Sequence, residues 1–247
     1  MEIFGIDVGG SAIKGAPVNT ETGEFIKDRY KIETPTPAKP EAMGKVIAQL
    51  IDHFDWKGRI GVGFPSVVKK GICYSAANIH KSWVGANIEE VFSNATGCPV
   101  KAINDADAAG IAEMRFGAGK GINKGVVLVL TLGTGIGSAI FVDGHLMPNV
   151  EFGHLEMNGK DAEKRASAGV RQQKKLSWKA WGNRLNDYLK EVDSLINPDL
   201  IILGGGVSSR YGKYQQFLTV RSRIVTAEFL NNAGIVGAAL AAEDLDL

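Results

Sequence analysis

The chain has 247 residues, of which 45% are hydrophobic, and its 28 basic and 27 acidic residues leave a formal net charge of +1. This balance gives no general attraction to nucleic acid or to an acidic membrane surface, and no apolar run approaches the roughly 20 residues that a membrane helix needs. The two cysteines, Cys73 and Cys98, have no metal-ligand spacing, and the N-terminus lacks the basic and apolar regions of a signal peptide. These features predict a globular cytoplasmic protein with reduced thiols.

Apolar runs bounded by glycine and proline predict strands, and apolar residues at helical spacing predict helices between them. The expected strands cover residues 3–8, 12–18, 25–32, 60–64, 100–103, 126–130, 139–142 and 200–203. The expected helices cover residues 41–54, 87–95, 105–116, 185–196 and 235–242. In both halves a strand pair comes first, and further strands and helices follow. This order predicts two related α/β halves.

A glycine turn between the first two expected strands is the first candidate for ligand binding. Its polar and glycine residues are Asp7, Gly9, Gly10, Ser11 and Lys14. Because glycine has no Cβ, consecutive backbone N–H groups can converge on an anion there, and the serine and lysine add a hydroxyl group and a cation. A carboxylate beside such an anion site fits a hydrated divalent metal between the two.

Two further glycine segments also follow apolar runs. The first of them contains Thr131, Gly133, Thr134, Gly135 and Gly137, and the second consists of Gly204, Gly205 and Gly206. The tetrapeptide Gly-Ser-Ala-Ile occurs at 10–13 and again at 137–140, which favours a duplicated fold with a phosphate held between the halves. The position of all three segments after strands favours nucleotide or phosphate binding over simple turns.

Spacing excludes two common phosphate motifs. Residues 117–121 read Gly-Ala-Gly-Lys-Gly, without the spacing of a P-loop or the Ser or Thr that follows its lysine. Residues 133–137 read Gly-Thr-Gly-Ile-Gly, one residue short of a dinucleotide fingerprint, and a strand rather than a helix is expected after them. The phosphate site is therefore expected to be of another type.

Asn104 and Asp105 lie where an expected strand passes into a helix. Either residue can cap the helix. An acid beside an amide also suits a sugar, because a carboxylate can accept two hydrogen bonds and remove a proton from a hydroxyl group. The N-terminus of the helix would keep that carboxylate ionised at neutral pH. Asp105 is therefore the candidate catalytic residue, and capping is the alternative.

The second polar candidate is the segment Glu151-Phe152-Gly153-His154-Leu155-Glu156. Glu151 and His154 are three residues apart around a glycine, so both can face one cavity, and an ordinary surface histidine is the alternative. A metal site is not favoured, because no cysteine or second histidine is near in sequence. A basic stretch follows, which is expected to be either a solvated helical face or a track for a polyanion. Its members are Lys160, Lys164, Arg165, Arg171, Lys174, Lys175 and Lys179.

Together these segments resemble the ROK family of bacterial sugar kinases over nearly the whole chain. The matching segments are 7–14 and 132–137 for the donor phosphates, 104–105 for the catalytic pair, 151–154 for the sugar and 203–206 for adenosine. Segments 77–83, 152–156, 161–167 and 232–239 are similar to members that use polyphosphate, including the glucomannokinase variant. The resemblance implies an α/β fold with two RNase H-like lobes of the actin–hexokinase–Hsp70 (ASKHA) type. The lobes are expected at 1–104 and 105–247, with a last helix at 234–245 that can pack back on the first lobe.

The same resemblance implies transfer of a terminal phosphoryl group to the 6-hydroxyl of glucose, with Asp105 as proton acceptor and Asp7 holding Mg²⁺ through water. The residues that would bind the sugar are Asn78, Asn104, Asp105, Glu151, His154 and, as a substitute for the family's last glutamate, Glu163. Most relatives carry a cysteine-rich zinc motif after the glycine-histidine segment. No cysteine follows Cys98, so zinc is expected to be absent and His154 to contact the sugar.

The phosphoryl donor is left open between polyphosphate and ATP. Polyphosphate needs a cation-lined track, for which 160–179, Lys120 and Lys124 are candidates, and ATP needs a base pocket near 204–206. Glucose and mannose are both open as acceptors, and the family implies a homodimer. Sugar-responsive repressors of the family carry an N-terminal helix-turn-helix, whereas this chain begins in a strand, so no nucleic acid is expected. A polyphosphate hydrolase and an actin-like filament protein are the remaining alternatives.

Overall fold

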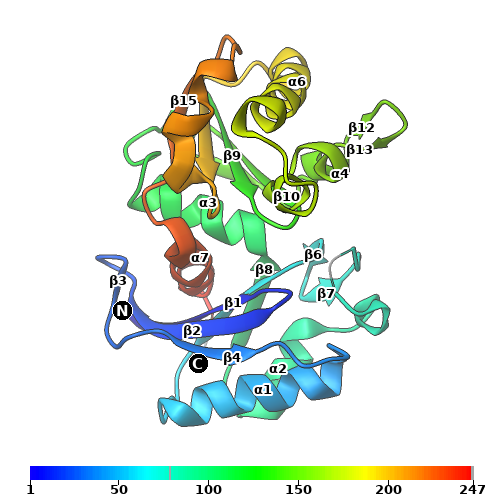
Figure 1. The fold of residues 1–247 in the computed structure, drawn as a ribbon. Helices are drawn as coiled ribbons and strands as arrows, with labels where there is room; N and C mark the ends of the chain where they lie inside the picture. Colours follow the sequence, from blue (N-terminus) through cyan, green and yellow to red (C-terminus); the bar gives the residue numbers. More distant parts are fainter. Residues whose placement is uncertain (78, 246–247) are drawn as a thin grey trace. The chain divides into compact units, whose positions relative to one another are not determined.

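The computed structural model describes residues 1–77 and 79–245, so Asn78, assigned above to the sugar site, lies outside the described residues. The chain forms two compact units (Figure 1). The first comprises Met1–Ala112 and the segment that starts at Asn232, and the second comprises Glu113–Asn231. The chain thus leaves the first unit near the end of helix α3 (Asp105–Arg115), later than the expected boundary at 104/105, and returns in η5 (Leu230–Asn232). Among the described helices, none has both the length and the apolar character that a membrane crossing requires.

The first unit is built on a sheet with strand order β3-β2-β1-β5-β8, in which β4 also pairs with β2. Its strands are β1 (Glu2–Val8), β2 (Ala12–Asn19), β3 (Glu24–Phe25), β4 (Tyr30–Glu33), β5 (Ile60–Phe64) and β8 (Val100–Asn104). Strands β1 and β2 form an antiparallel hairpin, and β5 and β8 run parallel to β1. The other elements are α1 (Pro40–His53), α2 (Ile88–Thr96), α7 (Ala233–Ala241), β6 (Val68–Lys69), β7 (Ile72–Cys73) and η1 (Lys81–Trp83).

The two faces of this sheet differ because side chains alternate along each strand. Phe4 and Ile6 point into the apolar core that α1 and α2 complete. Gly5 lies between them in the sequence and faces the other way, where a Cβ would overlap the carbonyl of Ile235 in α7. Small residues on this second face therefore let α7 pack directly on the strands. Asp7 lies on the same face as Gly5, because residues two apart in a strand point to the same side of the sheet.

The second unit has a sheet with strand order β11-β10-β9-β14-β15. Its strands are β9 (Val126–Leu132), β10 (Ile136–Val142), β11 (His145–Met147), β14 (Leu200–Gly204) and β15 (Arg223–Thr226). Its helices are α4 (Glu163–Ala166), α5 (Ala168–Gln173) and α6 (Trp178–Ile196). The short elements are η2 (Phe152–His154), β12 (Glu156–Met157), β13 (Lys160–Asp161), η3 (Ser208–Lys213) and η4 (Gln215–Phe217).

Both sheets follow one plan. An antiparallel hairpin lies in the middle, a further antiparallel strand extends it on one side, and two parallel strands extend it on the other. Parallel strands need a long connection, and in the second unit α6 lies in the segment between β9 and β14. The expected class, an α/β protein with two RNase H-like lobes of the ASKHA type, is confirmed.

The duplicated hairpins do not align on the tetrapeptide Gly-Ser-Ala-Ile. Val8 pairs with Ile13 at the end of the first hairpin, and Leu132 pairs with Ile136 at the end of the second. The turn 9–11 between β1 and β2 therefore corresponds to the turn 133–135 between β9 and β10, whereas Gly137 and Ser138 already lie inside β10. The fold is repeated, but the four-residue match falls at different places in the two copies.

The strand expected at 25–32 is wrong as a single element. The structure has two short strands there, β3 and β4, both paired with β2. Pro17 of β2 lies opposite the break, and because proline has no N–H group the ladder loses a donor at this point. The helix expected at 185–196 is longer than predicted, since it begins at Trp178 after the N-cap Ser177. Trp178, Trp181 and Leu185 stand at helical spacing, so the apolar repeat extends further toward the N-terminus than the predicted element.

Candidate active site

The first glycine turn is fixed from outside by a residue to which the sequence assigned no role. Gly9 donates its N–H to the carbonyl of Ala12 at 3.0 Å, which closes the turn. Thr34 donates its hydroxyl to the carbonyl of Gly9 at 2.6 Å, and its N–H to the carbonyl of Ser11 at 3.2 Å. Gly10 and Ser11 lie exposed at the tip. The turn therefore presents its backbone to solvent while the segment that follows β4 supports it.

Asp7 and Lys14 form an ion pair at the base of this turn, with Nζ 3.2 Å from Oδ2. The two side chains are 21% and 28% exposed, so both can still reach a ligand. A Cβ on Gly234 would lie 3.1 Å from Cγ of Asp7, so the carboxylate lies against the first turn of α7. A carboxylate that is half-buried and held on two sides can bind a hydrated Mg²⁺ through water, which is the ligand set this ion prefers.

Asn104 takes the capping role that the sequence left open between Asn104 and Asp105. The Asn104 side-chain oxygen accepts the N–H groups of Ala106 at 2.8 Å and Asp107 at 3.0 Å, and its amide donates to the carbonyl of Ser66 at 3.0 Å. Asn104 is only 6% exposed. It is thus the cap of α3. Asp105 begins the helix and also accepts the N–H of Ala106, at 2.9 Å.

The segment 151–154, predicted to bind the sugar, is packed against β10. Ser138 donates its hydroxyl to the carbonyl of Val150 at 2.7 Å and accepts the N–H of Phe152 at 2.9 Å. A Cβ on Gly153 would overlap the carbonyl of Ile136, so only glycine allows η2 to approach the strand this closely. These contacts set the direction of the side chains on either side of Gly153.

The structure brings together the three sugar-site residues that were predicted in this unit. The Nε2 atom of His154 lies 3.8 Å from Oε2 of Glu151, and its Nδ1 atom lies 3.5 Å from Oδ2 of Asp161. Glu163 accepts the N–H of Ile136 at 3.2 Å. Burial raises the pKa of Glu151, the nearby charge of Glu163 raises it further, and His154 opposes the shift. Asp161 is a fourth member whose role the sequence did not reveal.

This group also has the composition of a weak metal site. Ligand atoms of His154, Asp161 and Glu163 lie within 4.8 Å of one another, and among the described residues this is the one such trio. However, Nζ of Lys164 lies 2.8 Å from Oδ2 of Asp161, and this ion pair lowers the pKa of Asp161. A cation of the protein therefore already neutralises one of the three ligands, so the group fits hydroxyl recognition better than metal binding.

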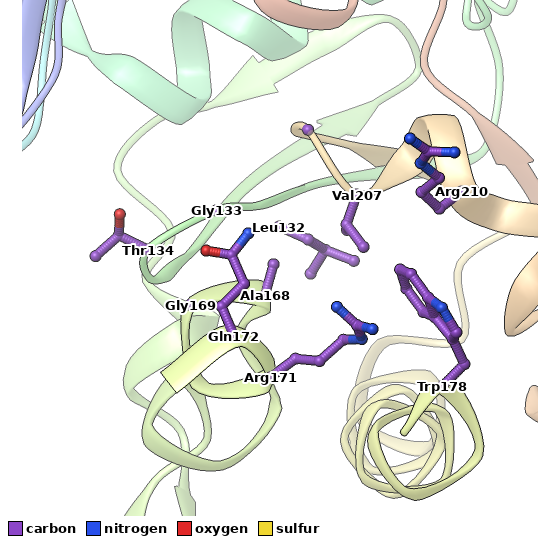
Figure 2. Close-up of a pocket in the computed structure, with 11 residues that line it drawn as sticks. Leu132, Gly133, Thr134, Ala168, Gly169, Arg171, Gln172, Trp178, Val207 and Arg210 are labelled. Atoms are coloured by element: carbon purple, nitrogen blue, oxygen red, sulfur yellow. The ribbon is translucent and has the colours of Figure 1, made fainter. Parts of the chain in front are cut away.

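A cavity of about 440 Å³ lies beside the second glycine turn (Figure 2). It is lined by Leu132, Gly133, Thr134, Ala168, Gly169, Arg171, Gln172, Trp178, Gly206, Val207 and Arg210. Two of these described residues are arginines and none is acidic. The cavity is therefore electropositive, which suits a phosphate-bearing ligand.

Backbone contacts that only glycine permits hold this cavity together. Gly205 has a φ of +81°, and a Cβ there would overlap the backbone of Leu132. Gly169 donates its N–H to the carbonyl of Gly133 at 2.9 Å. The second and third glycine segments thus meet, as a common phosphate site requires. Gly204 and Gly137 instead lie within strands, and both pair with Thr131.

The basic stretch 160–179 is not one helical face, so that expectation is wrong. It runs through β13, α4 and α5 into the start of α6. Arg165 pairs with Asp187 at 3.0 Å, whereas Arg171 lines the cavity. Trp178 and Arg210 also line the cavity, and neither was predicted from the sequence as a site residue. The alternation of Arg210 and Lys213 with Tyr211 and Tyr214 was the available signal, since basic and aromatic residues together often line anion sites.

Comparison with known proteins agrees with the motifs. A family model described as the ROK family matches residues 3–171. The polyphosphate glucokinase of Mycobacterium tuberculosis (strain ATCC 25618 / H37Rv) is 48% identical over 239 residues, covering 96% of this chain and 90% of that protein. The crystal structure of the inorganic polyphosphate/ATP-glucomannokinase from Arthrobacter sp. strain KM has a TM-score of 0.93 at 45% identity, with 97% of each chain covered. A ROK family glucokinase from Streptomyces griseus, solved with glucose and AMPPNP, shares the fold at a TM-score of 0.81 and 23% identity, covering 97% of this chain and 98% of that one.

Proposed function

The chain belongs to the ROK family, and from this premise we propose that it transfers the terminal phosphoryl group of inorganic polyphosphate to the 6-hydroxyl group of glucose. Its similarity to the M. tuberculosis polyphosphate glucokinase over 96% of its length supports this reaction. The observation that carries the donor is the cavity beside the second glycine turn, which has two guanidinium groups and no acid among its described lining residues.

On the donor side, the backbones of the two glycine turns, 9–11 and 133–135, bind the phosphates at the reacting end. Lys14 adds a positive charge, and Asp7 would hold Mg²⁺ through water. When bound, Mg²⁺ neutralises the negative charge of the donor phosphates. Asp7 pairs with Lys14, but its side chain remains 21% exposed, so the carboxylate can still bind the water shell of this ion.

On the acceptor side, Glu151, His154 and Glu163 bind hydroxyl groups of the sugar, together with Asn104 and Asn78. Asp105 accepts the proton of the 6-hydroxyl as that oxygen forms its bond to phosphorus. The bond from phosphorus to the bridging oxygen breaks, and the donor leaves one phosphoryl unit shorter. Because the transition state of such transfers is loose, alignment and charge neutralisation supply most of the rate acceleration.

ATP is the second candidate donor and mannose the second candidate acceptor. The Arthrobacter protein is named for both donors and for both sugars, and it is 45% identical to this chain. We further propose a homodimer, as the family resemblance implies, and a cytoplasmic location, in keeping with two buried free cysteines. Light scattering coupled to gel filtration tests the dimer.

The decisive experiment combines the purified protein, Mg²⁺, a hexose and a donor in an assay coupled to oxidation of glucose 6-phosphate. We expect product from glucose with polyphosphate, and the same samples with ATP measure the donor preference. Mannose 6-phosphate needs a separate isomerase step before detection. Release of orthophosphate without sugar would identify a polyphosphate hydrolase instead. If no hexose were phosphorylated by either donor, the proposed function would be wrong.

A further inference from the structure

The most unusual feature of the cavity is the pair formed by Arg171 and Trp178. The guanidinium carbon of Arg171 lies only 3.5 Å from the centre of the Trp178 ring, and Figure 2 shows this group pointing at the indole. The ring of Tyr214 is nearly parallel to the same indole, at 14° and 5.9 Å between centroids. The ammonium of Lys213 lies 5.8 Å from the ring centre. The aromatic surface of Trp178 is therefore already occupied by protein groups.

Among the residues that the structure describes, no carboxylate forms an ion pair with either arginine of the cavity. In the described part of the chain, no ion pair is found for Arg171 or Arg210, whereas Arg165 of the same basic stretch pairs with Asp187. The Nε atom of Arg171 is buried, and among the described residues it has no hydrogen-bond partner. A partly buried guanidinium without an acid is costly unless an anion completes it. This cavity therefore calls for an anionic ligand.

The shape of these groups discriminates between the two candidate donors. A purine base is uncharged and gains most of its affinity by stacking on an open ring or entering an apolar slot. Here Arg171 lies over the ring that would serve as this platform. Every unit of polyphosphate, by contrast, offers oxygens that a guanidinium can bind in pairs. Thr134 and Gly133 of the second glycine turn line the same cavity, so a chain whose reacting end lies at the turn can continue into it.

We propose that Arg171, held on Trp178, together with Arg210 forms a subsite for internal units of the polyphosphate chain and disfavours the adenine of ATP. Arg171 is thus the residue that sets donor preference. This inference deepens the proposed function and rests on it for its meaning in catalysis. The binding that it describes can be measured without any sugar or turnover.

The test is the dissociation constant of a short polyphosphate of defined length and of ATP, measured by calorimetry on the full chain without glucose. Loss of one charge-assisted contact in Arg171→Gln or Arg210→Gln is expected to weaken polyphosphate binding about tenfold or more. Arg171→Gln should leave the affinity for ATP unchanged or increase it, because the indole is uncovered. The polyphosphate affinity of Arg171→Lys should lie between those of the unaltered protein and Arg171→Gln, since lysine keeps the charge but not the planar guanidinium group.

Lys190→Gln is the matched control. Lys190 is an exposed cation on α6, the same helix as Trp178, and it does not line the cavity. Its position in the sequence places it about 18 Å along the helix from Trp178. The variant should bind both donors as the unaltered protein does. Arg210 is exposed, so Arg210→Gln remains informative if Arg171→Gln proves unstable.

The inference is overturned if Arg171→Gln and Arg210→Gln bind polyphosphate as tightly as the unaltered protein, or if Arg171→Gln weakens polyphosphate and ATP by equal factors. The proposed function fails in a different way. In that case no donor would phosphorylate a hexose, while the variants would still show a selective loss of polyphosphate affinity.

Discussion

The side chain of Asn104 caps the helix that Asp105 begins. Because Asn104 accepts the backbone N–H groups of Ala106 and Asp107, the cap of α3 does not depend on Asp105. Removing the acid should therefore change chemistry more than stability, whereas removing the amide should lower stability. This separation makes the catalytic assignment testable.

Asp105→Asn should lower kcat for glucose phosphorylation by about 10²- to 10⁴-fold, the range that a positioned general base contributes. The amide cannot take the proton of the 6-hydroxyl, but it retains the size and hydrogen-bonding reach of the acid. Glucose binding, measured by intrinsic fluorescence, and the midpoint of thermal unfolding should change little. Unaltered turnover in this variant would remove Asp105 from its proposed role.

The neighbouring variant Asn104→Ala serves as the control. It loses the cap and the hydrogen bond to Ser66, so we expect the free energy of unfolding to fall by about 1–2 kcal/mol. Denaturant titration of both variants under identical conditions measures the difference. Equal destabilisation of the two variants would mean that Asp105 also contributes to capping.

Glu151 should make stability depend on pH. Burial, with help from the charge of Glu163, raises the pKa of Glu151 in the folded protein above that in the unfolded chain. The folded state therefore holds this proton more tightly, and the stability gained at low pH is lost as pH rises through the raised pKa. Glu151→Gln cannot ionise and avoids this loss. We expect its melting temperature to exceed that of the unaltered protein at pH 7. The difference should shrink as the pH falls below the ordinary pKa of a glutamate side chain.

Thermal unfolding across this pH range measures the effect. Glu156→Gln, at an exposed position of β12, is the control and should follow the unaltered protein at every pH. The same Glu151→Gln variant should bind glucose more weakly, since it loses a carboxylate acceptor. A Glu151→Gln variant less stable than the unaltered protein at pH 7 would show that the carboxylate of Glu151 stabilises the fold.

The sequence predicted most of the fold because its signals were local. Clustered glycines at the ends of apolar runs marked the hairpins, and Asn104-Asp105 marked the start of α3. The tetrapeptide Gly-Ser-Ala-Ile was misleading for a physical reason. A sheet register is set by which residues pair across the hairpin, and Ile13 corresponds to Ile136 rather than to Ile140.

The cavity was harder to predict, because its walls come from separate stretches of the chain. Arg171 was visible only as one cation in a basic run, and Trp178 as one aromatic residue before a helix. The inference about this pair depends on the 3.5 Å between the guanidinium carbon of Arg171 and the centre of the Trp178 ring. That distance results from the packing of α5 against α6. No spacing in the sequence encodes that distance.

Asp7→Asn should raise the Mg²⁺ concentration needed for half-maximal activity, because a neutral amide holds a hydrated cation less well than a carboxylate. It should also free Lys14 from its ion pair. Activity measured against Mg²⁺ concentration at fixed donor gives the answer. Lys45→Gln, which breaks the exposed pair with Glu41, is the control and should leave the Mg²⁺ dependence unchanged. An unchanged Mg²⁺ dependence in Asp7→Asn would place the metal elsewhere.

Two adjacent glycines of the third segment should respond differently to one added methyl group. Gly205 has a φ of +81°, where a residue with a Cβ is strained, and its Cβ would overlap the backbone of Leu132. Gly205→Ala should therefore lower the free energy of unfolding by about 1–3 kcal/mol or more, since the backbone of Leu132 cannot move aside. At Gly206 a Cβ would enter open space, with no atom within 4 Å, so Gly206→Ala should stay within about 0.5 kcal/mol of the unaltered protein.

Chemical denaturation of both glycine variants measures this difference in stability. Because Gly205 holds the third segment against the second turn, Gly205→Ala should also weaken binding of both donors, whereas Gly206→Ala serves as the matched control for stability. If the two variants were equally stable, the contact between these glycine segments would not be what holds the cavity in shape.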